Sequence, residues 1–358
     1  MTGKWFRAWS RFAITVRNPM RQTVLIPGLM LAGTLIVFAP GAYSTELKPD
    51  VEEWVLRMER EHQFDADELR DMLAQFKPNK RIIKAINTPA TSKPWHFFDN
   101  LYVTTSRIDG GVNFWNKHAE LLERARDKYG VPEEVMTAII GIESSYGKRT
   151  GSFQVADALY TLGFEVPRRS TFFKGQFEHF MLLTRENDFD PLAIKGSFAG
   201  AMGIPQFIPS SYRDYAIDFD KDGRTDLWGS VADAVGSVAN YLSRFGWNDG
   251  EQVVLRAKLS SSDTAKLESL GVKPSLTIKQ FRARGVETDG NPADDTKGGF
   301  FVLEDKKGPQ YWISLNNFYV ITRYNRSKNY AMAVHQLSQK IAQERRAKIA
   351  KLDTSGVN

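Results

Sequence analysis

Residues 131–148 read VPEEVMTAIIGIESSYGK, and this stretch decides the fold class of the region around it. Pro132 is placed to start a helix, because a proline in the first turn removes no helical hydrogen bond, and Gly147 is predicted to cap its end. Between them, apolar side chains recur at helical spacing in two adjacent stripes, which start at Val135 and Met136. The stretch is therefore predicted to be a helix with a wide apolar surface.

One acid, Glu143, continues this apolar surface, seven residues after Met136 and three after Ile140. An acid there loses hydration, and the negative end of the helix disfavours its charged form, so its pKa should rise. A raised pKa suits a general acid that works near neutral pH. The alternative is an ordinary glutamate in the last turn that pairs with Lys148 or Arg149, and the spacing alone favours this alternative.

A second informative stretch, KGSFAGAMGIPQFIPSSY, runs from Lys195 to Tyr212. Its glycines remove side chains where a backbone must approach a ligand closely, although tight packing within the protein explains them as well. Gln206 lies between two prolines, whose stiff backbone fixes the direction of its amide. Pro209 and the two serines that follow it are typical of a helix start. We interpret the stretch as one wall of a binding site.

A third stretch, NFYVITRYNRSKNYAMAVHQL at residues 317–337, concentrates tyrosines just ahead of an amphipathic helix. Tyr319, Tyr324 and Tyr330 each offer a flat apolar face to sugar C–H groups and a hydroxyl for hydrogen bonding. For any one of these tyrosines, packing in the protein core is an equal alternative.

The rest of the sequence predicts a fold of the α+β class that is mainly α. Helices are expected over residues 48–76 (two helices, the second opened by Asp65), 112–128, 231–245 and 328–349. Residues 251–313 contain short β-rich runs, with Gly308-Pro309 as a turn.

The three stretches, in this order and spacing, resemble the membrane-bound lytic murein transglycosylase B family. The resemblance rests on IESSYG, GSFAGAMGIPQFIPSSY and FYVITRYNRSKNYAMAV and extends over nearly all of residues 50–340. It implies a lysozyme-like core with a flanking helical domain and a small β subdomain. It also implies nonhydrolytic cleavage of the MurNAc–GlcNAc β-1,4 bond of peptidoglycan, which leaves a 1,6-anhydromuramoyl end.

The expected domain boundaries follow from the resemblance and the composition together. They are 1–45 for a signal peptide or membrane anchor, 46–125 for the helical domain, 126–250 for the lysozyme-like core, 251–314 for the β subdomain, 315–345 for the C-terminal part of the core and helical domain, and 346–358 for a disordered tail.

The resemblance implies that Glu143 is the single catalytic acid/base. Positions that match the glycan groove of the family are Gln206, Tyr241, Tyr324, Asn325 and Tyr330, with weaker matches at Ser197, Phe207, Arg168 and Arg169. Phe98 stands where relatives have a tyrosine, which leaves that contact open.

Ordinary glycosidases use two carboxyl groups, but no second acid shares a motif with Glu143. The resemblance implies that the 2-acetamido group of the substrate assists instead. Glu143 would protonate the leaving oxygen and then take the proton of the C6 hydroxyl that attacks the anomeric carbon. This chemistry needs no cofactor. The alternatives are a hydrolytic muramidase, which would leave reducing ends, and a noncatalytic peptidoglycan-binding scaffold.

Residues 218–229, DFDKDGRTDLWG, follow the pattern of an EF-hand calcium loop in which one position is wrong. Aspartates occupy positions one, three, five and nine, but the acidic twelfth ligand is replaced by Gly229, and Asp233 is a candidate substitute. The candidate metal-site residues are Asp218, Asp220, Asp222, Arg224 and Asp226. A weak structural Ca²⁺ site and a solvated loop of aspartate turns are equal alternatives.

The composition and the first residues indicate an exported protein. Five basic residues and no acid occur in residues 1–22, and the apolar run from Val24 to Ala39 follows, as in an export signal or a retained anchor. The chain has no cysteine, which excludes disulfides and a lipoprotein anchor. We therefore expect a periplasmic protein that binds peptidoglycan strands and cell-wall synthesis or remodelling proteins, and that touches the membrane only through its N-terminal segment. The net charge of +6 also suits nucleic acid, but export and the lack of a basic recognition helix argue against it.

Overall fold

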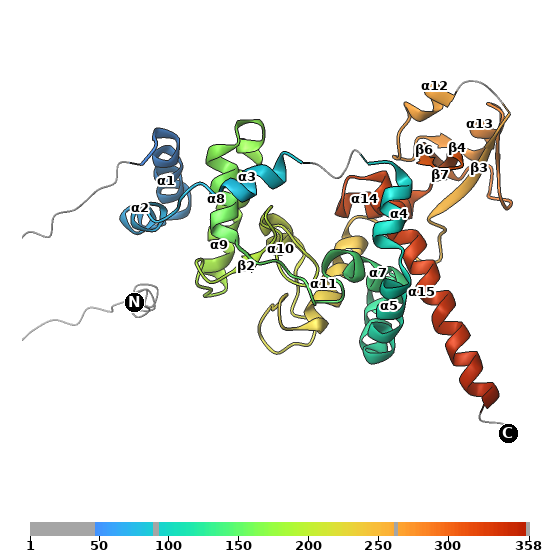
Figure 1. Cartoon of the computed structure of the whole chain (residues 1–358), viewed down its shortest axis with the longest axis horizontal. Helices are drawn as coiled ribbons and strands as arrows, with labels where there is room; N and C mark the ends of the chain where they lie inside the picture. The colour runs from blue at the N-terminus through green and yellow to red at the C-terminus, as the bar shows by residue number, and fades with distance from the viewer. Residues whose placement is uncertain (1–46, 89–92, 261–263, 356–358) are drawn as a thin grey trace, which may run out of the picture. The chain divides into compact units, whose positions relative to one another are not determined.

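Helices make up most of the described residues, and a small sheet is built from strands in the C-terminal third of the sequence (Figure 1). The structure is a computed structural model that describes residues 47–88, 93–260 and 264–355. The predicted signal peptide or anchor at residues 1–45 lies outside these ranges. Within them, no helix is both long enough and apolar enough to cross a membrane.

The helices follow one another along the chain, some after short connections and others after long loops or strands, as at residues 187–208. They are α1 (Pro49–His62), α2 (Ala66–Leu73), α3 (Lys80–Ile86), α4 (Trp95–Tyr102), α5 (Thr105–Lys117), α6 (Ala119–Tyr129), α7 (Glu133–Ser144), α8 (Val155–Glu165), the 3₁₀ helix η3 (Pro167–Arg169), α9 (Ser170–Glu186), α10 (Pro209–Tyr215), α11 (Val231–Arg244), α12 (Thr264–Glu268), α13 (Ile278–Arg282), α14 (Asn316–Tyr324) and α15 (Lys328–Ser355).

Several helix boundaries confirm the sequence prediction. Asp65 caps α2 by accepting hydrogen bonds from the backbone N–H groups of Asp67 and Glu68. Helix α10 begins at Pro209, and α11 occupies almost the whole predicted range 231–245. In each case a local capping residue or a proline marked the start.

Three local predictions are wrong. Residues 112–128 are not one helix, because His118 leaves the helical backbone conformation (φ −121°, ψ 30°) and separates α5 from α6. The predicted disordered tail is helical as far as Ser355, since α15 continues without a proline or glycine to stop it. Gly308-Pro309 is not a turn, because the hairpin reverses one step earlier, at Lys306 and Lys307.

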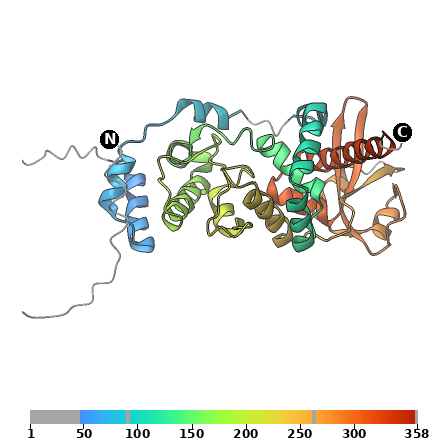
Figure 2. The same cartoon turned by 90° about the horizontal axis from the view of Figure 1, so that it is seen from below.

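The β structure forms an antiparallel five-stranded sheet of order β4-β6-β7-β3-β5. Its strands are drawn in orange and orange-red in Figures 1 and 2. The strands are β3 (Val254–Leu259), β4 (Leu276–Thr277), β5 (Val286–Thr288), β6 (Lys297–Asp305) and β7 (Gly308–Ser314); β1 (Phe153–Gln154) and β2 (Lys195–Gly196) form a separate pair. All five strands of the sheet lie within the range predicted for the β subdomain. The domain boundaries themselves stay a prediction.

Strand β6 joins two hydrophobic cores, because its side chains alternate between the faces of the sheet. Phe300 and Val302 pack in a small core with α12 and α13. Phe301 and Leu303 pack in the main core, where the ring of Phe301 stacks on Phe318 of α14 with 4.6 Å between centroids. The sheet is thereby attached to α14, the helix that ends at Tyr324.

Helix α7 lies in the middle of the main core and contacts α5, α6, α11 and α15. Its buried residues lie on every side of the helix, so the two apolar stripes of the sequence are parts of one continuous buried surface. Only the two ends of α7 are less than fully buried, and Glu143 lies at one of them, in the last turn.

Candidate active site

The turn directly after Glu143 has an unusual backbone. Helix α7 ends at Ser144, and its C-cap is Ser145 (φ 51°), not the predicted Gly147. Ser145, Tyr146 (φ 63°) and Gly147 (φ 81°) are three successive residues in the left-handed region, which is unfavourable for the two that carry side chains. Such a conformation persists only where the surroundings impose it.

The residues that impose it are Tyr146 and Arg107, which we call the Arg107–Tyr146 clamp. The hydroxyl of Tyr146 donates to the backbone oxygen of Arg107 at 2.5 Å. In return, Nε of Arg107 donates to the backbone oxygen of Gly141 at 3.0 Å, and another guanidinium nitrogen donates to that of Leu101 at 2.6 Å. The clamp therefore joins α4, α5 and the last turn of α7, directly behind Glu143.

Glu143 is partly buried, and its Oε1 accepts a hydrogen bond from the hydroxyl of Tyr330 at 2.5 Å. Desolvation raises the pKa of Glu143 to about 7, and the hydrogen bond from Tyr330 opposes that rise. No ion pair joins Glu143 to any residue in the described ranges. The alternative of a glutamate paired with Lys148 or Arg149 is therefore wrong.

Aromatic side chains from distant parts of the chain gather near this carboxyl group. Tyr330 and Tyr241 are buried, and Phe207, which is also buried, lies 5.6 Å from Tyr241 and 5.7 Å from Tyr324 between ring centroids. Burial raises the pKa of Tyr324 and of Tyr330 well above the usual value, and the charge of Glu143 adds to both shifts. These tyrosines therefore stay neutral and act only as hydrogen-bonding groups near Glu143.

The hydroxyls of the other two tyrosines predicted for the site, Tyr324 and Tyr241, form hydrogen bonds with the protein backbone. Tyr324 donates to the backbone oxygen of Pro205 at 2.5 Å, and Tyr241 donates to that of Arg323 at 2.6 Å. These bonds tie α14 to the Gln206 segment and α11 to α14. Tyr319 lies elsewhere, in a pocket beside the sheet.

Gln206 has a left-handed backbone (φ 52°), and its amide nitrogen donates to the backbone oxygens of Thr150 at 3.0 Å and Gly203 at 2.8 Å. The side chain of Gln206 is thereby fixed to Thr150, which follows Glu143 by seven residues in the sequence. Ser197 closes a turn, since its Oγ accepts from the backbone N–H groups of Ala199 and Ala201.

The glycines of this stretch serve packing within the protein. A Cβ on Gly196 would collide with the backbone of Ala201, and a Cβ on Gly203 would collide with the backbone of Leu227. Of the two explanations that the sequence left open, close approach between protein segments is the one the structure shows.

Four predicted site residues make no hydrogen bond or ion pair with the groups around Glu143 in the described structure. Arg168 and Arg169 are exposed on η3, and Asn325 is exposed just after α14. Phe98 is buried, with its ring 6.0 Å from that of Tyr102. The structure thus groups Glu143 with Tyr330, Tyr324, Tyr241, Phe207 and Gln206, and leaves these four outside that group.

Tyr102 is a neighbour of Glu143 that the sequence reasoning missed. Desolvation and the charge of Glu143 raise the pKa of Tyr102, and Arg107 lies over its ring at 5.3 Å from the centroid. The only local signal was the aromatic density of α4, WHFFDNLY, which a hydrophobic core explains equally well.

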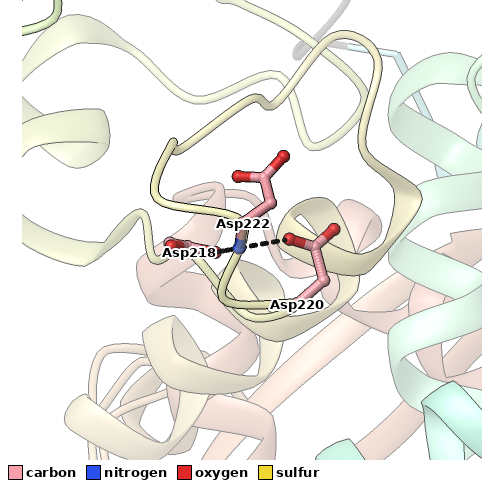
Figure 3. A group of neighbouring side chains, drawn as sticks. All are labelled: Asp218, Asp220 and Asp222. Atoms are coloured by element: carbon pink, nitrogen blue, oxygen red, sulfur yellow. Dashed lines mark hydrogen bonds between the residues drawn. The ribbon is translucent and has the colours of Figure 1, made fainter.

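The acidic loop separates into two groups of aspartates. Oxygen atoms of Asp218, Asp220 and Asp222 lie within 4.8 Å of one another (Figure 3). Asp226 faces the other way, because its Oδ1 accepts from the backbone N–H groups of Trp228 and Gly229. Asp233 is buried, and its carboxylate accepts hydrogen bonds from the backbone N–H groups of Phe219 and Asp226. These bonds stabilise the loop conformation. Arg224 is exposed, with its backbone N–H on Asp222.

The three clustered carboxylates are the hard oxygen donors that Ca²⁺ prefers, and they fit one side of a calcium site. Gly229 offers no carboxylate to the other side, and Asp226 and Asp233 are directed to the backbone.

A single partly buried carboxyl group with a pKa near 7 is what the protonation of a glycosidic leaving oxygen requires. The mainly helical α+β fold is that of the lysozyme-like class, to which its solved relatives also belong.

The comparison with known proteins identifies the family within this class. The family model described as transglycosylase SLT domain matches residues 47–339, so the chain belongs to this family and is a lytic transglycosylase. It is 40% identical over 304 residues to membrane-bound lytic murein transglycosylase B of Escherichia coli K12, covering 82% of this chain and 83% of that protein.

Solved structures of lytic transglycosylases have the same fold as this chain. The crystal structure of the soluble lytic transglycosylase SltB1 from Pseudomonas aeruginosa is 45% identical, with a TM-score of 0.78, covering 83% of this chain and 99% of the other. The Escherichia coli lytic transglycosylase Slt35 in complex with calcium is 39% identical, with a TM-score of 0.76 and coverage of 83% and 94%. SltB3 from Pseudomonas aeruginosa, in complex with NAG-NAM-pentapeptide, is 29% identical, with a TM-score of 0.70 and coverage of 81% and 78%.

Proposed function

We propose that this enzyme cleaves the MurNAc–GlcNAc β-1,4 bond of peptidoglycan without hydrolysis and leaves 1,6-anhydromuramoyl ends, with Glu143 as its only catalytic acid/base. The observation that carries the proposal is the environment of Glu143. Desolvation raises its pKa to about 7. Among the described residues, the neutral phenol of Tyr330 alone opposes this shift, and no other carboxylate contributes to it. A carboxyl group in this state is protonated in a large fraction of molecules at neutral pH and can both donate and recover a proton.

In the proposed reaction, Glu143 first donates its proton to the glycosidic oxygen as the bond to the anomeric carbon breaks. The substrate's 2-acetamido oxygen stabilises that carbon from the opposite face, because no other carboxylate of the described residues contributes to the electrostatics of Glu143. The Glu143 carboxylate then takes the proton of the C6 hydroxyl as this oxygen bonds to the anomeric carbon. Tyr330 stabilises the carboxylate between the two steps through its hydrogen bond.

The groups that hold the glycan are proposed from their place near Glu143. Tyr324, Tyr241 and Phe207 form an aromatic cluster for sugar faces, and the fixed amide of Gln206 keeps its oxygen for a polar sugar group. Ser197, Asn325, Arg168, Arg169 and Phe98 are proposed as more distant contacts of a longer glycan.

Digestion of purified sacculi with product analysis by mass spectrometry tests the proposal. Anhydro products are lighter than hydrolytic products by one water, so the assay separates a transglycosylase from a muramidase. Glu143→Gln should abolish product formation while it spares the fold, because the amide is nearly isosteric but cannot donate and recover a proton. Reducing ends from the wild type, or turnover by the Glu143→Gln variant, would contradict the proposal, and binding without turnover would favour a scaffold.

We also propose that the loop of Asp218, Asp220 and Asp222 binds a structural Ca²⁺. The convergence of three carboxylates supports it, and so does the calcium complex of Slt35. With only three clustered carboxylates, binding should be weak, and the ion would brace the loop without taking part in the sugar chemistry.

The proposed location is the periplasm, with residues 1–45 either removed or retained as an anchor. The proposed partners are peptidoglycan strands and cell-wall synthesis or remodelling proteins. The relative in Escherichia coli carries "membrane-bound" in its name, and the basic-then-apolar order of residues 1–39 supports export.

A further inference from the structure

The ring of Tyr146 lies among three glycines that we call the glycine socket, Gly110 and Gly111 of α5 and Gly141 of α7. A Cβ on Gly110 would lie 2.7 Å from Cε2 of the tyrosine ring. On Gly111 or Gly141, it would lie 2.8 or 2.6 Å from the hydroxyl oxygen of that ring. Only residues without a side chain leave room for the ring here, so the socket fixes the turn that carries Tyr146, three residues after Glu143.

The hydroxyl of Tyr146 closes the socket by its bond to the backbone oxygen of Arg107. Burial raises the pKa of this hydroxyl well above its usual value, so it keeps its proton and stays a donor. The guanidinium of Arg107 holds the backbone oxygen of Gly141, two residues before Glu143, and lies over the ring of Tyr102. The Arg107–Tyr146 clamp therefore holds the backbone on both sides of Glu143, and in the described structure neither residue of the clamp bonds to the carboxyl group itself.

Helix α5 also sets the distance between α7 and α15, because it packs against both. Helix α15 comes close at Gly111, where an added Cβ would collide with Cδ1 of Ile341 as well as with Tyr146. Glu143 lies in the last turn of α7 and Tyr330 in the first turn of α15, so the hydrogen bond between them depends on the spacing of these two helices. The contacts of α5 thus act on the carboxyl group through the backbone of two helices.

We propose that Arg107 and Tyr146 are positioning residues of the reaction, which hold the last turn of α7 so that the carboxyl group of Glu143 stays in place and out of water. The proposal rests on the proposed role of Glu143 as the proton donor, and it gives neither residue of the clamp a contact with the glycan. The three successive left-handed residues support it, because so unfavourable a backbone persists only where the surroundings impose it. Without the clamp, the turn would relax to a common cap with one left-handed residue, and water would reach the carboxyl group.

The test begins with Tyr146→Phe in the full-length enzyme, which deletes the hydroxyl and keeps the ring. We expect kcat on soluble peptidoglycan fragments to fall about tenfold and KM to stay within about twofold, because a displaced acid affects the transition state more than substrate binding. The alkaline limb of the kcat profile should move about half to one pH unit lower, because desolvation is the largest cause of the raised pKa of Glu143 and water would reduce it. Loss of the Tyr330 bond alone would move that limb upward, so the direction of the shift identifies the clamp.

Arg107→Ala should have the same two effects, and Arg107→Lys should keep part of kcat, because its ammonium can still bond to one backbone oxygen. Ser314→Ala in β7 is the matched control. It also deletes a buried hydroxyl that donates to a distant backbone oxygen, that of Val272 at 2.9 Å. This change should lower the melting temperature but leave kcat, KM and the pH profile as they are in the wild type.

Each kcat is taken per folded molecule, with the folded fraction measured by circular dichroism at the assay temperature, so a partly unfolded variant still gives a result. The proposal would be overturned if Tyr146→Phe kept the kcat and pH profile of the wild type, moved the alkaline limb upward, or changed KM alone. Failure of the proposed function is seen separately in the products from sacculi, because fragment cleavage is counted whether the new ends are anhydro or reducing.

Discussion

Tyr330 donates its phenolic hydrogen to Oε1 of Glu143 over 2.5 Å, and the two residues are 187 positions apart in the sequence. The bond brings the start of α15 to the end of α7. Within the described part of the chain, it is the one polar contact that stabilises the charged form of Glu143 against the desolvation of its surroundings. The chemistry of the site therefore depends on a balance between burial, which favours the acid, and Tyr330, which favours the carboxylate.

Tyr330→Phe should move the pH profile of the enzyme upward. The hydrogen bond from Tyr330 lowers the pKa of Glu143, so its loss raises that pKa further above 7. A general acid works while it is protonated, so activity that falls as pH rises should persist about half to one pH unit higher in the variant. The measurement is the pH dependence of kcat/KM on peptidoglycan fragments. Tyr215→Phe is the control, because that ring packs on Tyr241 without bonding Glu143. A downward shift, or equal shifts in both variants, would contradict the prediction.

Glu143→Gln should make the protein more stable at alkaline pH. The folded pKa of Glu143 is about 7, above the ordinary 4.5, so the folded state resists its ionisation. The protonated Glu143 side chain costs no stability below pH 4.5, where it is protonated in both the folded and the unfolded chain. As the pH rises through 7, the free energy of unfolding falls, because the unfolded chain has released a proton that the folded chain retains. The amide removes this loss, which amounts to about 3 kcal/mol at most. Urea unfolding of both proteins at pH 5 and pH 9 measures the difference. A gap that does not widen with pH would show that Glu143 is not desolvated.

The position of Glu143 on an apolar surface of its helix was predictable from the sequence, because a helix has a fixed period. Its environment was not. The bond from Tyr330 and the proximity of Tyr102 depend on how α4, α7 and α15 pack, and no local pattern encodes a contact across 187 residues. The spacing alone even favoured a salt bridge, since Lys148 and Arg149 are near in sequence but do not pair with Glu143.

The helix ends likewise divide into those set by neighbouring residues, which the sequence predicts, and those set by tertiary packing, which it does not. Asp65 and Pro209 marked helix starts because a cap or a proline acts on its own neighbours. The break at His118 carries no glycine or proline, and the cap at Ser145 depends on the Arg107–Tyr146 clamp. Gly147 was a reasonable cap by residue type, but the clamp imposes the left-handed conformation two residues earlier.

Gly141→Ala should destabilise the protein strongly, because a Cβ at this position would lie 2.6 Å from the hydroxyl oxygen of Tyr146. The ring cannot move without giving up its bond to Arg107, so the loss should be about 2–4 kcal/mol, and the catalytic rate should fall as the turn after Glu143 shifts. Gly175→Ala in α9 is the matched control: no atom lies within 4 Å of its added Cβ, and the change should stabilise the helix by about 0.5–1 kcal/mol. Chemical denaturation measures both. Equal effects would mean that the clamp is not rigid.

Calcium should raise the melting temperature of the wild type by a few degrees, because an ion that binds only the folded loop stabilises it by mass action. Asp222→Ala should remove this increment, since Asp222 supplies one of only three clustered carboxylates. Asp71→Ala, which deletes an exposed acid on α2, should keep it. Asp226→Ala should instead lower the melting temperature even in a chelator, because the backbone N–H groups of Trp228 and Gly229 lose their acceptor. Thermal melts of the four proteins, each with CaCl₂ and with EDTA, separate the two roles. If calcium leaves the wild-type melting temperature unchanged at millimolar concentration, the aspartates of this loop only cap one another's backbone.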